Sequence, residues 1–516
     1  MKRIISILLA ALLAASLLAG CTAEKASKID TAVRGNLLKI TSADEFRAGM
    51  LENVIVRSDI ADGAIELVKG AAEGTFTSIE YDADEFYRMV ASWNASIDEG
   101  GAVEVWARAK YGEEWTDWLT WGRFTPYESR GTRDNKTCEG ARVDQDTFVL
   151  SKGAGTQVQL RAVLTRADAE SPSPILRQLS MTFSGGQMAA AYAEEAEESL
   201  PDKALCYAPA YSQEVRSPEI ADSICSPTTM TVMMNSRGMD ILPEEYALRV
   251  KDNAENIFGS WSFTCSGAGL YGFECYCQYA NEDILMQELA KGHACGISVR
   301  YSPNNSGGQP RLDGCWRSTG GHLIAIIGYE YEDGVRDADH LYFYSSDSFA
   351  EDDAHSFRRY SWKQLSRCWE NRVAYIIPEM DSEVDQGALA PGIGREIVTV
   401  ETLGNGKYRL LHADDSPVDM AAFKQSGGTI AYCADGVYTD MRDGGVASDH
   451  SIVYEMAMQV TANNTFFYTQ AGSDGAFSMN ADELLQKAAE AGLDDACIHV
   501  YAMGGDGHCY HGVLEN

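Results

Sequence analysis

Short runs in which apolar and polar positions alternate dominate the chain up to about residue 185. Residues 102–108 read Ala-Val-Glu-Val-Trp-Ala-Arg, a period of two that is typical of a half-buried strand. Similar runs rich in Val, Trp, Phe and Thr recur between turn residues, which predicts an antiparallel β-sandwich over residues 30–185. Four aromatic side chains in this segment fit its core, with a carbohydrate or peptide groove as the alternative: Trp115, Trp118, Trp121 and Phe124.

Two stretches interrupt the pattern and divide the rest of the chain. Residues 186–203 and 379–394 gather small, acidic, Gly and Pro residues, so we interpret both as linkers. The segment between them, residues 204–378, carries the candidate chemistry. Residues 395–516 combine strand patterns with an amphipathic helix near residues 481–491, which predicts a small mixed α/β domain without an assigned function. The predicted fold class is therefore α+β and multidomain, and we find no internal repeat.

The first 21 residues have the layout of an export signal. Lys2 and Arg3 precede an uncharged apolar run over residues 4–18, and Leu-Ala-Gly-Cys ends at Cys21. This motif resembles the lipobox of bacterial lipoproteins, which implies acylation of Cys21 and a mature chain that begins there. We expect a body anchored by lipid to the outer face of the bacterial cytoplasmic membrane. An ordinary secretory signal, giving a secreted protein, and an uncleaved anchor are the alternatives.

Charge and cysteine content narrow the remaining possibilities. The formal net charge of -34 argues against nucleic acid as a partner, because phosphates need Lys and Arg, but it does not identify a substrate or an oligomeric state. Setting Cys21 and Cys225 aside from the 13 cysteines leaves an odd number, so at least one thiol stays free or pairs between chains. No pair of cysteines has the C-x-x-C spacing expected of a zinc ribbon or a redox site. Four central cysteines are interpreted as core thiols or occasional disulfides: Cys265, Cys275, Cys277 and Cys295.

The central segment contains a cysteine placed to act as a nucleophile. Cys225 precedes Ser226, a good N-cap, and Pro227, which is favoured at the first helical position. Met230, Met233 and Met234 then fall on one helical face. A cysteine at a helix N-terminus lies near unpaired N–H groups that favour the thiolate, although buried inert cysteines are common.

A histidine and an aspartate complete the constellation. The apolar run that follows His322 predicts a buried strand with the imidazole at its start, and residues 341–344 predict a second strand that ends near Asp347. The turn-rich connection between them predicts an antiparallel hairpin, which would bring His322 beside Asp347. A carboxylate in that position would orient the imidazole. A strand-initial His and a turn-forming Asp can also be purely structural.

Residues 211–378 resemble the bacteriocin-leader-processing (double-glycine leader) cysteine peptidases, family thirty-nine of the papain-like clan, and especially their exported relatives. The resemblance rests on Tyr211-Ser212-Gln213, Cys225-Ser226-Pro227-Thr228, residues 321–329, Ser346-Asp347 and residues 362–377. It implies a papain-like fold in which Gln213 and the Cys225 N–H bind the oxyanion, Cys225 forms the acyl-enzyme, His322 transfers the proton and Asp347 orients it. Ser226 and Ser348 depart from the Gly and Pro that family members often carry.

We therefore expect an extracytoplasmic, lipid-anchored cysteine endopeptidase that acts on a peptide or protein through a thioester, without a cofactor. A surface binding or adhesion protein with an inactive peptidase-like domain and a cell-wall peptide hydrolase are the alternatives. Bacteriocin maturation is not expected, because no transporter is fused to the chain. His293 and His355 are expected to be solvated or packed. No metal site is expected, because the terminal trio lacks a fourth ligand at a recognisable spacing: His508, Cys509 and His511.

Overall fold

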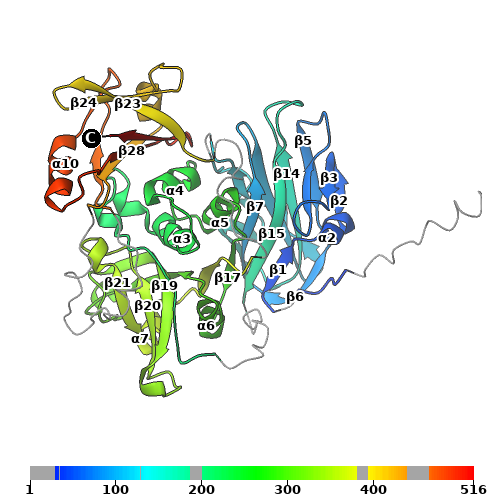
Figure 1. Ribbon diagram of the computed structural model, residues 1–516. Helices are drawn as coiled ribbons and strands as arrows, with labels where there is room; N and C mark the ends of the chain where they lie inside the picture. The colour runs from blue at the N-terminus through cyan, green and yellow to red at the C-terminus, as the bar shows by residue number, and fades with distance from the viewer. Residues whose placement is uncertain are drawn as a thin grey trace, which may run out of the picture.

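The computed structural model describes residues 29–33, 35–127, 130–185, 200–380, 393–437 and 464–515 (Figure 1). The predicted signal segment with Cys21, and most of both predicted linkers, lie outside the described residues. Within the described ranges, no helix is long and apolar enough to cross a membrane.

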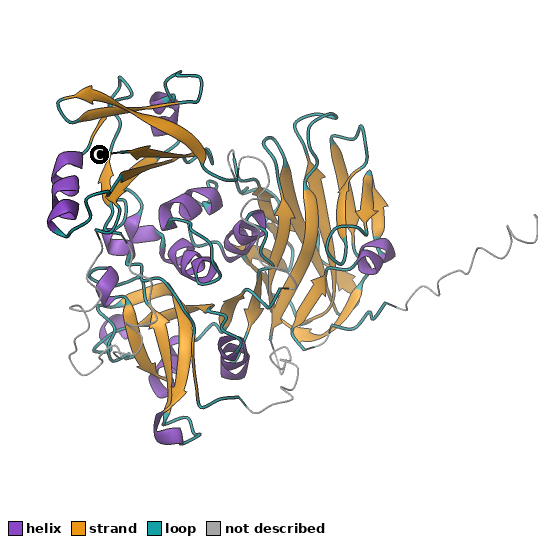
Figure 2. Cartoon of the chain, in the orientation of Figure 1, coloured by secondary structure: helices purple, strands orange, loops and turns teal. Residues whose placement is uncertain are grey.

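The N-terminal segment consists of two antiparallel sheets, as Figure 2 shows. The 8-stranded sheet has the order β11-β12-β13-β7-β15-β4-β3, with β1 paired to β15. The other sheet has the order β10-β8-β14-β5-β2, with β6 paired to β14 and β9 to β8. The elements are β1 (Leu37–Ile40), α2 (Ala43–Ala48), β2 (Met50–Glu52), β3 (Val54–Arg57), β4 (Ala64–Leu67), β5 (Glu73–Thr77), β6 (Tyr81–Phe86), β7 (Arg88–Ser96), β8 (Ala102–Tyr111), β9 (Glu114–Trp115), β10 (Leu119–Phe124), β11 (Thr137–Cys138), β12 (Ala141–Asp144), β13 (Thr147–Leu150), β14 (Gly155–Thr165) and β15 (Ile175–Ser184).

The two N-terminal sheets share an aromatic core. The ring of Trp93 on β7 lies 6.2 Å from that of Phe124 on β10, and Trp121 lies 6.2 Å from Phe148 on β13. Trp121 and Phe124 are buried, so neither lines a surface groove. Trp118, which is partly exposed, has the Arg161 guanidinium over its ring at 4.1 Å.

The central segment is built on one antiparallel sheet of order β17-β22-β18-β19-β20-β21, with β16 paired to β19. Helices α3 and α4 lie between this sheet and the C-terminal part of the chain (Figure 1). The strands are β16 (Lys203–Leu205), β17 (Tyr276–Tyr279), β18 (Cys295–Tyr301), β19 (Thr319–Tyr331), β20 (Leu341–Ser346), β21 (Phe357–Ser361) and β22 (Val373–Ile376). The helices are α3 (Cys225–Asn235), α4 (Pro243–Val250), α5 (Trp261–Leu270), α6 (Glu282–Ala290) and α7 (Trp362–Cys368).

The central segment covers one face of the N-terminal 8-stranded sheet. Helix α5 approaches β7 so closely that a Cβ on Gly269 would lie 2.7 Å from the Cα of Asn94, which leaves no space for a side chain there. Asn94 donates its amide to the Cys265 carbonyl and accepts the Cys275 N–H, at 3.2 and 2.9 Å. Strand β7 is therefore buried on both faces, and its polar positions bond backbone groups of the central segment.

The C-terminal segment forms a 7-stranded mixed sheet of order β26-β25-β28-β29-β23-β24-β27, in which β23 and β29 run parallel. The predicted helix is α10 (Ala481–Glu490), and the strand patterns of this segment form the sheet. A small apolar cluster joins this sheet to the central segment, with Ile224 packed in the same cluster as Ala431 and Met503. The remaining elements are β23 (Glu396–Gly404), β24 (Lys407–Leu411), α8 (Met420–Gln425), β25 (Thr429–Ala434), β26 (Phe467–Thr469), β27 (Phe477–Ser478), β28 (Ile498–Met503) and β29 (Cys509–Leu514).

Candidate active site

Cys225 is the first residue of α3, so its thiol lies at a helix N-terminus. The prediction that Ser226 caps this helix is wrong: the N-cap is Ile224, which makes no side-chain cap hydrogen bond. The Ser226 hydroxyl is instead buried inside the helix packing, 3.0 Å from the Thr264 hydroxyl and 2.8 Å from that of Tyr375. Because no side chain caps the first turn, its N–H groups remain directed at the region of the thiol.

The hairpin of β19 and β20 brings the histidine and the aspartate into contact. Ala325 faces Ser346 in this antiparallel pair, so His322 near the start of β19 lies beside the end of β20. The His322 Nε2 and an Asp347 carboxylate oxygen are 2.8 Å apart, and both side chains are buried. This is the geometry that the hairpin predicted. It leaves the other ring nitrogen, Nδ1, for the hydrogen bond between His322 and Cys225.

Three further donors hold the Asp347 carboxylate, and sequence reasoning did not identify them. Tyr301 on β18 and Tyr360 on β21 both donate their hydroxyls to its Oδ2 at 2.8 Å. The Phe349 N–H donates to Oδ1 at 3.0 Å. Burial opposes ionisation, but the charge of His322 and these hydrogen bonds keep the pKa of Asp347 below its ordinary value.

The electrostatics favour a charged cysteine–histidine pair. Burial lowers the pKa of His322, but the charge and hydrogen bond of Asp347, together with Cys225, raise it to about 10. Burial likewise raises the pKa of the Cys225 thiol, yet the hydrogen bond and charge of His322 and nearby backbone N–H groups leave it below its ordinary value. The arrangement therefore stabilises a thiolate beside an imidazolium, which is the nucleophilic form of a cysteine.

Gln213 lies in a short 3-10 turn, η1 (Gln213–Val215), and is buried. Its amide nitrogen donates to the Ala221 carbonyl at 2.9 Å, in the turn η2 (Ala221–Ser223) just before Cys225. Its amide oxygen accepts the Ser348 hydroxyl at 3.0 Å, and Ser348 directly follows Asp347. Within the part of the chain that the structure describes, the second amide N–H of Gln213 has no bonding partner.

Aromatic rings shield the imidazole. The Phe349 ring centroid is 5.5 Å from that of His322, and Trp316 packs edge-on against Phe349 at 5.7 Å. The Arg317 guanidinium lies over the Phe349 ring at 4.2 Å and forms an ion pair with Glu214 at 2.8 Å. The segment with Trp316 and Arg317 is thereby held against the turn that carries Gln213. The rings restrict water around the histidine–aspartate hydrogen bond, which strengthens it.

The other candidate ligands and thiols lie apart from this constellation. His293 contacts Glu288 at 2.9 Å and His355 contacts Asp352 at 2.7 Å. At the C-terminus, His511 contacts His499 at 2.9 Å and burial lowers its pKa to about 4. Among the described residues, no three His, Cys, Asp or Glu side chains gather as a metal site. The cysteines within these ranges are all free, and the Cys265 and Cys277 sulfurs are 3.5 Å apart.

Comparison with known proteins matches two segments of the chain to families. Residues 37–184 match the Peptidase C39 N-terminal domain, and residues 206–377 match the Peptidase_C39 like family. No curated protein matches the chain.

Among solved structures, the matches include the carbohydrate-binding module TmCBM61 in complex with beta-1,4-galactotriose, with 10% identity, a TM-score of 0.18 and coverage of 27% of this chain and 91% of that chain. Another is the C-terminal CBM6 of LamC, a laminarinase from Zobellia galactanivorans, with 11% identity, a TM-score of 0.16 and coverage of 28% and 99%. At these TM-scores we infer nothing from either likeness.

Proposed function

From the C39-like cysteine peptidase family to which residues 206–377 belong, behind a C39 N-terminal domain, we propose that the protein is an endopeptidase that uses Cys225 as its nucleophile. His322 is the proton carrier, Asp347 orients it, and Gln213 with the Cys225 N–H binds the oxyanion. The observation that carries the proposal is the buried 2.8 Å contact between His322 and Asp347, with the imidazole's other side bonded to Cys225 at the start of α3.

The reaction proceeds in two halves. The Cys225 thiolate attacks the peptide carbonyl, and the resulting oxyanion receives hydrogen bonds from the free amide N–H of Gln213 and from the Cys225 backbone. The His322 imidazolium gives its proton to the leaving amine, which leaves a thioester on Cys225. Neutral His322 then takes a proton from water as that water attacks the thioester, and the sulfur departs from the acid product as a thiolate, which restores the ion pair with the His322 imidazolium.

We also propose that the enzyme works outside the cytoplasm, anchored by lipid on Cys21. The Leu-Ala-Gly-Cys motif after the apolar run over residues 4–18 supports this location. Metabolic labelling with an alkyne fatty acid tests it in a bacterial host that processes lipoproteins. We expect labelled wild-type protein in the membrane fraction and unlabelled Cys21→Ser protein, while equal labelling of both would contradict the anchor.

The catalytic proposal is tested with an E-64-like epoxide probe and a library of quenched peptides. We expect probe labelling and hydrolysis by the wild type, loss of both in Cys225→Ala, and retention of both in Cys138→Ala, which removes another partly exposed thiol. Hydrolysis of purified peptidoglycan but not of peptides and proteins would identify a cell-wall hydrolase instead. Absence of any hydrolysis, together with equal probe labelling of the wild type and Cys225→Ala, would indicate a binding protein without peptidase activity.

A further inference from the structure

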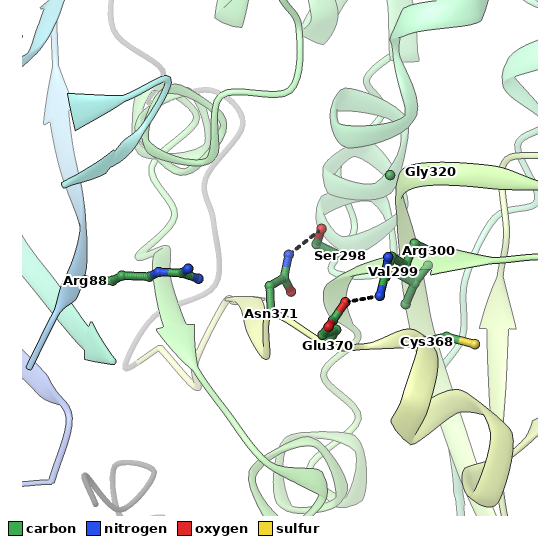
Figure 3. Close-up of a pocket in the computed structure, with 9 residues that line it drawn as sticks. Arg88, Ser298, Val299, Arg300, Gly320, Cys368, Glu370 and Asn371 are labelled. Carbon is green, nitrogen blue, oxygen red and sulfur yellow. Dashed lines mark hydrogen bonds and ion pairs between the residues drawn. The ribbon is translucent and has the colours of Figure 1, made fainter. Parts of the chain in front are cut away.

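A cavity of about 380 Å³ lies between the N-terminal sheet and the central sheet (Figure 3). Two of the residues that line it, Gly320 and Gly321, directly precede His322 in the sequence. Arg88, at the start of β7, extends into it from the N-terminal side. Ser298 and Arg300 on β18, with Glu370 and Asn371 after α7, line the opposite side. The cavity is therefore built by both segments and exists only when they are joined.

The strand pairing connects this cavity to the active site. Val299 on β18 faces His322 on β19, but the register then shifts so that Tyr301 faces Thr319. The extra residue falls in β19 at Gly320 and Gly321, which both line the cavity. A bulge at this position turns the backbone aside, and a Cβ added to Gly321 would meet no atom within 4 Å. The glycines that form this open wall thus directly precede, in the sequence, the residue that transfers the proton, His322.

The side chains that line the cavity leave positive charge unpaired. Arg88 is exposed and, within the described residues, its side chain makes no hydrogen bond or ion pair. Arg300 bonds Glu370 at 2.6 Å through one terminal nitrogen, while its Nε is buried without a partner. Two guanidinium groups therefore face one carboxylate, in a chain whose net charge is -34. A second carboxylate is the ligand that would satisfy the free donors.

We propose that this cavity is a substrate subsite that binds a carboxylate of the peptide, within a few residues of the scissile bond. The inference rests on the proposed peptidase function and adds a preference for substrates that carry a carboxylate near the cleaved bond. An extended peptide advances about 3.3 Å per residue. A substrate peptide held at Cys225 would therefore reach the cavity wall at Gly321 within a few residues of the cleaved bond. Arg88 binds the carboxylate, and Arg300 adds positive charge to the lining of the cavity. The carboxylate belongs to an acidic side chain or to a free C-terminus.

Matched quenched peptides test the subsite in the full-length protein. Each peptide carries Glu or Gln at one position on either side of the cleaved bond, and each is made with a free and an amidated C-terminus. We expect kcat/KM to be about tenfold or more higher for the carboxylate peptide at one position, mostly through KM, because a charge-assisted hydrogen bond contributes on this scale. Dependence on Glu identifies a side chain, and dependence on the free terminus identifies the α-carboxylate.

Three variants locate the selectivity. Arg88→Gln should remove most of the preference, whereas Arg142→Gln, which changes an exposed arginine on β12, should keep it. Glu370→Gln should increase the preference, because it removes the carboxylate that competes for Arg300. Equal kcat/KM for all matched peptides, or an unchanged preference in Arg88→Gln, would refute the subsite while Cys225-dependent hydrolysis leaves the peptidase proposal intact. Failure to hydrolyse any peptide would refute both.

Discussion

Replacing Asp347 by Asn keeps the shape of the side chain and removes the charge that holds His322. The carboxylate accepts hydrogen bonds from His322, two tyrosine hydroxyls and the Phe349 N–H, so an amide NH2 group would face a donor in either orientation. We expect Asp347→Asn to fold, because the tyrosine hydroxyls can rotate to accept a hydrogen bond. The imidazolium, however, loses the neighbour that stabilises it.

The magnitude follows from the pKa of His322. An increase from 6.5 to about 10 corresponds to roughly 5 kcal/mol in favour of the imidazolium. Without Asp347, burial still lowers the pKa of His322 and only the neighbouring Cys225 remains to raise it, so the pKa should fall. The wild-type ion pair should persist until the pH rises through about 10, whereas the variant should lose it at a lower pH. We expect kcat/KM at neutral pH to fall by about 10²- to 10⁴-fold.

The rate of alkylation of Cys225 by iodoacetamide, followed by peptide mass spectrometry across pH, measures this effect without a substrate. The wild type should react at mildly acidic pH, whereas Asp347→Asn should react only as the isolated thiol ionises at alkaline pH. Burial raises the pKa of other thiols such as Cys206 and Cys433 to about 12, so Cys225 should stand out. Asp352→Asn, which alters the surface pair with His355, is the control. Identical profiles for wild type and Asp347→Asn would refute the ion-pair reasoning.

Three further predictions concern the support of the site. Arg216→Ala should lower the free energy of unfolding in urea by about 3–5 kcal/mol, because it leaves Asp353 buried and unpaired, and a loss no larger than that of the exposed control Arg336→Ala would contradict this. Ser226→Ala should cost about 1–2 kcal/mol in the same assay and leave the alkylation profile of Cys225 unchanged, and a shifted profile would assign the hydroxyl to the chemistry. Burial raises the pKa of Asp146 to about 6, so its contribution to stability is present below about pH 4 and lost as the pH rises through 6. Asp146→Asn should therefore reduce the dependence of the free energy of unfolding on pH between about 4 and 6, measured by urea unfolding at a series of pH values. The same pH dependence in the variant and the wild type would contradict this.

The hairpin was predictable because its information is local. An apolar run after His322, a turn-rich connection and a second strand that ends near Asp347 fix an antiparallel register without reference to the rest of the chain. The helix that begins at Cys225 was predictable in place but not in detail. Ser226 has the intrinsic preference of an N-cap, and tertiary contacts with Thr264 and Tyr375 override it.

Long-range contacts were not predictable from one sequence. Tyr301 and Tyr360 reach Asp347 only because β18 and β21 flank the hairpin on opposite sides, an order that residue patterns do not encode. The same applies to the burial of both faces of β7. Its polar residues are buried because the central segment covers them. The cavity beside Gly321 likewise needs Arg88 from a distant strand.

The polar side chains of β7 have a practical consequence for protein engineering. Asn94 bonds the backbone of Cys265 in α5 and of Cys275 just before β17, so a recombinant fragment that starts at residue 200 would lose these contacts and expose the groups to water. Exchanging the central segment between homologues would require the N-terminal 8-stranded sheet to be exchanged with it. Crystallisation or inhibitor screening is therefore best attempted on a chain that retains both halves.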